Sequence, residues 1–251
     1  MSKISPLINV MKTAYNKVNR RIYRDFGEIE NLQGLDGKID RFFNKTYEFI
    51  ENNLKDYLTY CRPEWKFLND KYSSSKKDTY YWLLEPLSGK ENFKRSVPIF
   101  SSSISVFFND KIIATSIYDP LRNDFYFTEE GKGAFLNDHR IRVSNRKYLE
   151  NSLISLQVNN SSLEIEKIFL KHDIPIKNFR IFNSSIVSIS WLCNGKLDCF
   201  IGINIDQFLI QSSKLLLREA GGFFLEVNLN QNNFFICANP TIHKKIIKIL
   251  N

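Results

Sequence analysis

The residues best suited to do chemistry lie in one short stretch, WLLEPLSGKENF, at residues 82–93. Glu85 supplies a carboxylate, Ser88 a hydroxyl group and Lys90 an ammonium group, with Gly89 between the last two. Mg²⁺ prefers carboxylate ligands, and the backbone amides at the start of a helix bind phosphate. The stretch has the outline of a metal-dependent phosphatase site, and a metal-free alternative is binding of a phosphorylated small molecule at the amides of Gly89 and Lys90.

Cysteines and histidines, which often hold metals or act as nucleophiles, are dispersed along the chain. No pair of them shows the spacing of a metal site. We expect reduced, mostly buried thiols and surface imidazoles. The cysteines are Cys61, Cys193, Cys199 and Cys237, and the histidines are His139, His172 and His243.

Two long amphipathic helices are predicted at residues 5–25 and 39–58, because apolar residues recur every three or four positions in both. Residues 27–38 between them are predicted to form a glycine-punctuated loop or hairpin. The polar segment 73–78 is predicted to be a mobile loop.

The rest of the chain predicts α/β layers, with helix pairs between sheets. A strand meander is expected first, with turns at Asn109-Asp110 and at Gly131 and Gly133. Helices and strands then alternate. The expected helices cover residues 161–172, 183–195, 206–222 and 241–250, and the expected strands cover 151–158, 197–203, 223–229 and 234–240.

Composition points to a soluble globular protein. Hydrophobic residues make up 43% and charged residues 25%, and no apolar run approaches the roughly 20 residues that span a bilayer. The amino terminus lacks the continuous apolar stretch of a signal peptide, so we expect a cytoplasmic protein.

The formal net charge of +8 has two interpretations, compositional drift or a functional basic surface. Basic clusters at 73–78, 144–147 and 242–248 lie far apart in the sequence, and no RNA-binding module is recognisable. We therefore do not expect direct binding to nucleic acid.

Nearly the whole chain resembles the inositol monophosphatase family. Residues 82–93 follow the family pattern W-x-x-D-P-L-D-G-T-x-N-F, and YDPLRNDFYFTEEGKGAFLNDHRIRVS, NGKLDCFIG, LLLREAGG and ANP match later family segments. The opening RDFGEIENLQ resembles the bacterial branch that includes the extragenic suppressor protein SuhB. The resemblance implies one α-β-α-β-α layered sandwich over residues 1–251, with two intimate lobes at about 1–145 and 146–251. It also implies frequent dimers and a Mg²⁺-dependent phosphomonoesterase ancestor.

The chain departs from the family where the chemistry is done. Two Mg²⁺ ions need several convergent carboxylates to polarise the phosphate and to activate water. Glu85 replaces the first aspartate of the central pattern and keeps its charge. By the resemblance, Lys90 replaces the threonine that positions the attacking water, and the other former ligand or substrate positions are Thr46, Ser88, Asn183, Ser184, Gly202 and Leu209. Asp70, next to Asn69, is the nearest match to an upstream ligand, and Asp206 precedes Leu209 by about one helical turn.

Lys90 has two interpretations. Its ammonium group stands near a lost carboxylate, so a Glu85–Lys90 ion pair filling the old metal site is one hypothesis, and a solvated lysine at a helix start is the other. Four charged residues at family-like positions are expected to be structural: Asp119 and Asp198 as capping residues, and Arg218 and Glu219 as packing and surface residues.

Three functions remain open. The first is a non-catalytic scaffold or regulator with no cofactor, and the resemblance to the SuhB branch implies a role in ribosomal RNA transcription antitermination and ribosome maturation through proteins of the transcription machinery. The second is a residual Mg²⁺-dependent phosphatase that acts on inositol phosphate or a related sugar phosphate and uses Glu85, Asp70 and Asp206. The third is metal-free binding of a phosphorylated small molecule.

Overall fold

The computed structural model describes residues 4–34, 36–68, 77–159, 178–229 and 232–250. Asn69, Asp70, most of the segment 73–78 and the helix predicted at 161–172 lie outside these ranges.

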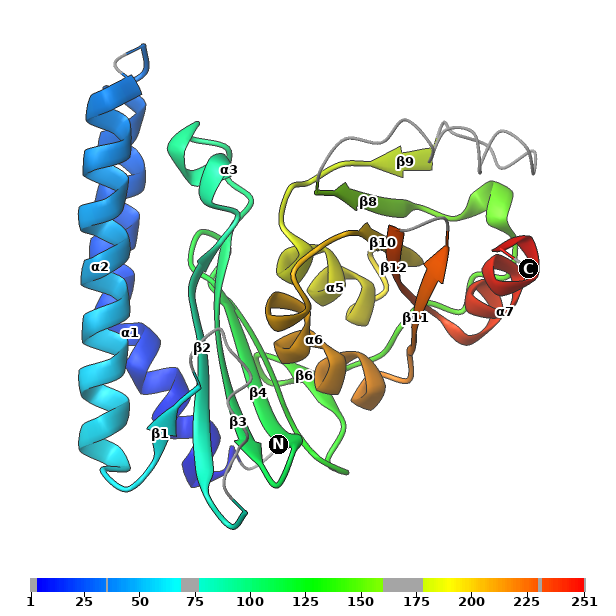
Figure 1. Cartoon of the computed structure of the whole chain (residues 1–251), viewed down its shortest axis with the longest axis horizontal. Helices are drawn as coiled ribbons and strands as arrows, with labels where there is room; N and C mark the ends of the chain where they lie inside the picture. Colours follow the sequence, from blue (N-terminus) through cyan, green and yellow to red (C-terminus); the bar gives the residue numbers. More distant parts are fainter. Residues whose placement is uncertain (1–3, 35, 69–76, 160–177, 230–231, 251) are drawn as a thin grey trace.

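The described elements form alternating layers (Figure 1). A pair of long helices covers one face of a first sheet, a second helix pair lies between that sheet and another, and a last helix covers the outer side. This confirms the predicted α-β-α-β-α sandwich. The helices are α1 (Pro6–Glu30), α2 (Asp36–Cys61), α3 (Lys90–Lys94), α5 (Ser185–Cys193), α6 (Gln207–Glu219) and α7 (Pro240–Leu250), with a 3₁₀ turn at Leu149–Asn151.

The first helix is longer than its pattern predicts. Ser5 caps its start by accepting a hydrogen bond from the Ile8 amide at 3.2 Å. The helix then continues through Gly27 to Glu30, because Ile22 and Ile29 prolong the buried stripe. The prediction of a loop or hairpin over 27–38 was therefore wrong for most of its length, since residues 27–30 and 36–38 are helical and, of the described residues, 31–34 form the turn between the helices.

The first sheet runs in chain order, β1-β2-β3-β4-β5-β6-β7. The predicted turn between β3 and β4 is confirmed, since Asn109 and Asp110 adopt left-handed φ values of 47° and 61°. In β2 the pairing with β3 shifts between Glu85 and Ser88. Pro86 lies inside that shift and has no N–H to donate. The strands are β1 (Lys66–Phe67), β2 (Tyr80–Ser88), β3 (Ser101–Phe108), β4 (Lys111–Asp119), β5 (Asp124–Glu129), β6 (Ala134–Leu136) and β7 (His139–Ile141).

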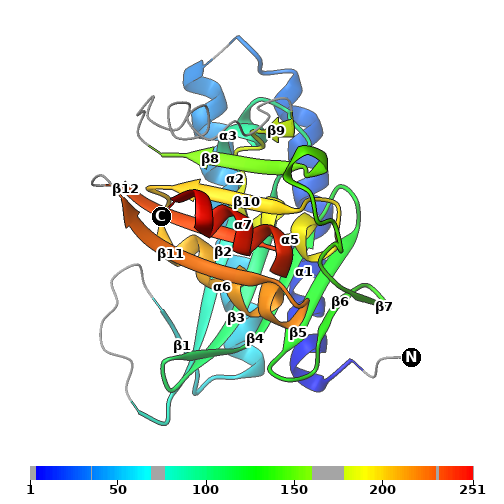
Figure 2. The same cartoon turned by 90° about the vertical axis from the view of Figure 1, so that its right-hand side faces the viewer.

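The second sheet has the order β11-β12-β10-β8-β9 and mixes parallel with antiparallel pairs. Helix α7 crosses its outer face, as Figure 2 shows, and buries Ile242 and Ile246 against it. Helices α5 and α6 fill the space between the two sheets. The strands are β8 (Ile154–Val158), β9 (Phe179–Arg180), β10 (Cys199–Ile203), β11 (Phe223–Leu229) and β12 (Asn232–Ala238).

Burial tests the expectations for cysteine and histidine. Three of the four cysteines are buried and all are free thiols, as predicted. His139 is exposed, but His243 is buried on the sheet side of α7, so the prediction of a surface imidazole there was wrong. Among the described residues, no helix is long and apolar enough to cross a bilayer.

Candidate functional site

The site begins where β2 ends. Glu85 is 9% exposed and Ser88 is 7% exposed, so both side chains are buried at the edge of the sheet. Gly89 turns the chain into α3 with φ +91°, and a Cβ atom there would lie 2.7 Å from the Ile99 carbonyl oxygen. Only glycine fits such a position without strain. The backbone conformation of residues 82–93 therefore depends on the glycine at position 89 as well as on the buried side chains.

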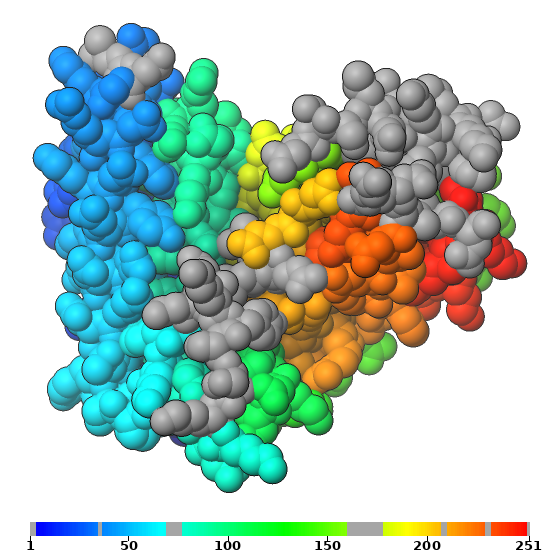
Figure 3. Space-filling view, in the orientation of Figure 1, coloured from blue at the N-terminus to red at the C-terminus, as the bar shows by residue number. Residues whose placement is uncertain are grey.

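Ser88 contacts the second helix pair. Its hydroxyl oxygen lies 3.2 Å from that of Ser184, the N-cap residue of α5. Nearby, the Asn92 amide donates to the Phe182 carbonyl at 2.7 Å and joins α3 to the segment that enters α5. In the space-filling view, α3 and that segment stand on opposite sides of a notch (Figure 3). The fold thus brings together two predicted site residues, Ser88 and Ser184, that lie 96 positions apart.

Thr46 is engaged elsewhere. It is fully buried on α2, and its hydroxyl donates to the carboxylate of Asp25 on α1 at 2.7 Å. Arg21 and Arg24 hold the same carboxylate, with N–O distances of 2.6 and 2.9 Å. A buried charge needs such partners, because burial removes its hydration. Thr46, which the resemblance assigns to a ligand position, therefore donates its hydroxyl to a carboxylate that two arginines already bind.

Sequence reasoning missed Asp25. Its signal was present, since Val18, Ile22, Asp25 and Ile29 share one face of α1 at helical spacing. A carboxylate on an otherwise apolar stripe, with arginine four residues earlier, indicates a buried ion pair.

Lys90 does not pair with Glu85. Its Nζ atom lies over the ring of Tyr47 on α2, 4.4 Å from the ring centroid. Within the described ranges no ion pair joins Lys90 to Glu85, so that hypothesis was wrong. The neighbouring Lys94 instead binds Asp40 of α2 with an N–O distance of 3.0 Å. That partner raises the pKa of the Lys94 ammonium. Both lysines of α3 thus help to join it to α2.

Gly202 lies in the middle of β10 and is buried. A Cβ atom there would come within 2.2 Å of Cδ1 of Ile205. The Ile205 side chain therefore occupies the space that a larger residue at 202 would need.

The remaining candidates lie apart from these contacts. Asn183 is exposed in a left-handed turn with φ 51°, Asp206 is exposed just before α6, and Leu209 lies in the first turn of α6.

The described residues do not fit a site for two Mg²⁺ ions. Such a site needs several carboxylate oxygens aimed at one point. Ser88 is hydrogen-bonded to Ser184, Thr46 is bonded to Asp25, and Gly202 has no side chain. No three His, Cys, Asp or Glu residues within the described ranges group closely enough to hold a metal ion. Glu85 is a buried carboxylate at a former ligand position, and one such group is too few.

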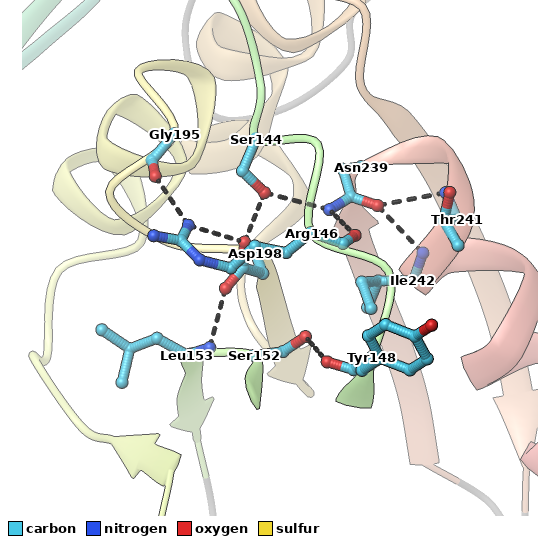
Figure 4. Close-up of polar contacts among 10 residues, drawn as sticks. All are labelled: Ser144, Arg146, Tyr148, Ser152, Leu153, Gly195, Asp198, Asn239, Thr241 and Ile242. Atoms are coloured by element: carbon cyan, nitrogen blue, oxygen red, sulfur yellow. Dashed lines mark hydrogen bonds and ion pairs between the residues drawn. The ribbon is translucent and has the colours of Figure 1, made fainter. Parts of the chain in front are cut away.

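Asp198 has the structural role expected of it, and it organises more of the chain than a single cap (Figure 4). Its carboxylate is fully buried and accepts hydrogen bonds from the Leu153 amide at 2.8 Å, from Arg146 at 3.1 Å and from Ser144. Asn239 extends the network by donating to the Ser144 hydroxyl at 3.0 Å. The network fixes the start of β8 and the 144–146 segment beside the start of α7.

Asp119 also has its expected turn role, since it accepts hydrogen bonds from the Leu121 and Arg122 amides. Burial raises the pKa of Asp119, and the Arg122 guanidinium opposes that shift from 2.7 Å.

Arg218 and Glu219 do more than the packing expected of them. Glu219 accepts hydrogen bonds from the Gly131 and Gly133 amides at 3.0 and 2.8 Å, and Arg218 contacts Glu130 at 3.2 Å. The end of α6 is therefore joined to the turn between β5 and β6.

The layers and the contact between β2 and α5 define the class of the protein, an α-β-α-β-α sandwich whose candidate site lies between the first sheet and the second helix pair. The chain belongs to the inositol monophosphatase family, whose sequence model matches residues 4–251.

Two relatives and one solved structure illustrate the similarity. The inositol-1-monophosphatase of Mesorhizobium japonicum is 29% identical over 97% of this chain and 96% of its own. The Nus factor SuhB of Buchnera aphidicola (subspecies Acyrthosiphon pisum) is 29% identical over 98% and 96%. The crystal structure of the extragenic suppressor protein suhB from Bartonella henselae is 27% identical, covers 98% of both chains and superposes with a TM-score of 0.79. The predicted family and its SuhB-like relatives are both confirmed.

Proposed function

We propose that this chain is a non-catalytic member of the inositol monophosphatase family that acts as a scaffold or regulator in transcription. The observation that carries the proposal is the set of alternative partners at the former metal positions. Ser88 bonds to Ser184 at 3.2 Å, and Thr46 donates to an Asp25 carboxylate that two arginines already hold. Two-metal hydrolysis needs carboxylates at such places, since hydroxyl groups do not offset the charge of Mg²⁺.

Relatives named Nus factor SuhB support the regulatory half of the proposal. By that similarity the chain would act with proteins of the transcription machinery, in ribosomal RNA antitermination and ribosome maturation. Preserved layers with altered site chemistry fit a role that depends on shape.

A residual phosphatase is the second candidate, favoured by the relatives named inositol-1-monophosphatase and by the buried carboxylate of Glu85. The family is ordinarily Mg²⁺-dependent. If bound, Mg²⁺ would supply charge stabilisation and an activated water, and Glu85 would be its ligand from the described residues.

Phosphate release from inositol 1-phosphate in millimolar Mg²⁺ separates the two candidates. The Mesorhizobium inositol-1-monophosphatase serves as the positive control, and calorimetric titration with Mg²⁺ accompanies the assay. We expect no release above buffer and no saturable Mg²⁺ binding. Turnover that disappears in Glu85→Gln would overturn the proposal and establish the phosphatase.

The regulatory half needs its own experiment. Purified chain is added to transcription by RNA polymerase and Nus factors through a terminator that follows a ribosomal RNA leader. We expect increased readthrough that persists in Glu85→Gln, because the proposed role does not use the old metal site. No change in readthrough would refute the regulatory role.

A further inference from the structure

Two basic segments that are far apart in the sequence meet on one surface. Asn239, just before α7, donates to the Arg146 carbonyl oxygen at 3.1 Å and to the Ser144 hydroxyl at 3.0 Å. The 144–148 segment and the start of α7 therefore lie side by side (Figure 4). The basic clusters at 144–147 and 242–248 therefore adjoin in space, although the sequence alone shows them as dispersed.

Helix α7 presents its lysines outward. Ile242 and Ile246 face the sheet and are buried, whereas Lys244 and Lys248 are exposed and Lys245 is half-buried. The three lysines, with Pro240 and Thr241, line a hollow of about 340 Å³. Figure 2 shows α7 lying across the face of the second sheet. The outer face of the helix is thus a strip of positive charge.

Exposed aromatic rings lie on either side of the lysine strip. Tyr148 is 60% exposed, and the Lys245 ammonium group lies 5.1 Å from its ring centroid. Phe223, at the start of β11, is 51% exposed, and its ring centroid lies 5.5 Å from that of His243 on α7. Both rings are more than half exposed, and the Tyr148 ring lies next to the Lys245 ammonium group.

The lysines of these two basic segments have few carboxylates near them in the sequence, and the nearest is the exposed Glu150. Neither residues 139–149 nor residues 240–251 contain an aspartate or glutamate. In the part of the chain that the structure describes, no ion pair involves Lys147, Lys244, Lys245 or Lys248. Arg146 differs, since it is bound to Asp198 at 3.1 Å. The four lysines are therefore available to an anionic partner.

We propose that this basic surface, made of Lys147, Tyr148, Phe223, Lys244, Lys245 and Lys248, binds single-stranded nucleic acid. Lysines track a phosphate backbone, and aromatic rings stack on bases that are not paired. An acidic peptide would use the charges but not the rings. A lipid surface would need a larger exposed apolar face than two rings beside a helix whose isoleucines point inward. The proposal goes beyond the proposed function and holds whether or not the chain hydrolyses phosphate esters.

Fluorescence anisotropy of labelled oligo-U and oligo-dT, about twelve nucleotides long, tests the proposal across a salt series. We expect measurable binding at low salt, with an affinity that falls as salt rises. Three to four phosphate contacts predict a slope of log K against log salt of about −2 to −3. A duplex of the same length should bind more weakly, because its bases are already stacked.

The main variant replaces Lys244, Lys245 and Lys248 with glutamine. We expect at least about ten-fold weaker binding at low salt and a slope shallower by about 2. The matched control replaces Lys38, Arg41 and Lys45 with glutamine on α2, whose helix covers the opposite side of the molecule. Both triple variants lower the net charge from +8 by three, so a general charge effect would weaken both equally.

A second variant tests the aromatic part. Tyr148→Ala should weaken binding at least about five-fold while Tyr148→Phe keeps it, since the ring and not the hydroxyl group stacks. The replaced side chains are all exposed or half-buried, and melting temperatures measured in parallel show that each variant is folded. The proposal is overturned by an absence of binding at low salt, by equal losses in the α2 control, or by tighter binding to polyglutamate or anionic vesicles.

Discussion

Replacement of Thr46 by aspartate introduces the residue type that the family resemblance implies for a metal-ligand position, and it tests whether this chain accepts that residue. The Thr46 hydroxyl lies 2.7 Å from an Asp25 carboxylate oxygen, and both residues are fully buried. Thr46→Asp therefore removes a donor and places a second carboxylate beside the first. Thr46→Val, of similar volume, removes the donor alone.

The two variants differ by a charge term that the geometry allows to be estimated. Loss of a hydrogen bond to a charged group costs about 1.5–3 kcal/mol, which is the cost expected for Thr46→Val. Two like charges about 4 Å apart repel by about 4 kcal/mol at an effective dielectric constant near 20. Arg21 and Arg24 offset part of that repulsion. We expect Thr46→Asp to be less stable than Thr46→Val by about 2–3 kcal/mol near pH 8.

Urea denaturation near pH 8 and near pH 5, with and without millimolar Mg²⁺, measures both variants. The introduced carboxyl has a folded-state pKa raised by its neighbour, so its cost is fully present at high pH and falls as the pH is lowered. The gap between the two variants should therefore narrow near pH 5. Equal stability near pH 8, or a Mg²⁺-dependent recovery of Thr46→Asp alone, would refute the reasoning and show that the site still accepts a metal.

Three further predictions concern other buried groups. Gly202→Glu should destabilise the fold by at least about 3 kcal/mol in urea denaturation, because its Cβ atom would lie 2.2 Å from Ile205. Adding Ile205→Ala should recover part of that loss. If the double variant recovers none of it, the steric cause is contradicted. Asp198→Ala should cost about 3 kcal/mol, because it leaves the Leu153 amide without its acceptor at 2.8 Å, and a loss below about 1 kcal/mol would be inconsistent with this role. Burial lowers the pKa of His243 below the ordinary value of 6.5, so protonation of this imidazole favours the unfolded chain. The free energy of unfolding should therefore decline as the pH falls below about 6.5. His243→Gln should remove this part of the pH dependence, measured by thermal unfolding.

The elements of this fold followed closely from local sequence, because their patterns depend on near neighbours. The stripe of α1 and the Asn109-Asp110 turn are both readable at short range. The end of α1 was missed because Gly27 resembled a break, although a continuing buried stripe overrides the weak helix propensity of one glycine. His243 was misplaced because exposure depends on which face of α7 meets the sheet.

The sequence by itself determined the family and the α-β-α-β-α layers, since these follow from motifs and patterns spread along the whole chain. It also predicted, from the resemblance alone, that Ser88 and Thr46 stand where the family has carboxylates. Only the tertiary structure decided what those positions now do. It joined Ser88 to Ser184, gave Thr46 a buried carboxylate partner and placed Lys90 over the Tyr47 ring instead of beside Glu85. It also joined two dispersed basic segments into one surface through Asn239. Contacts between residues about a hundred positions apart depend on how the layers pack, and local periodicity carries no record of that packing.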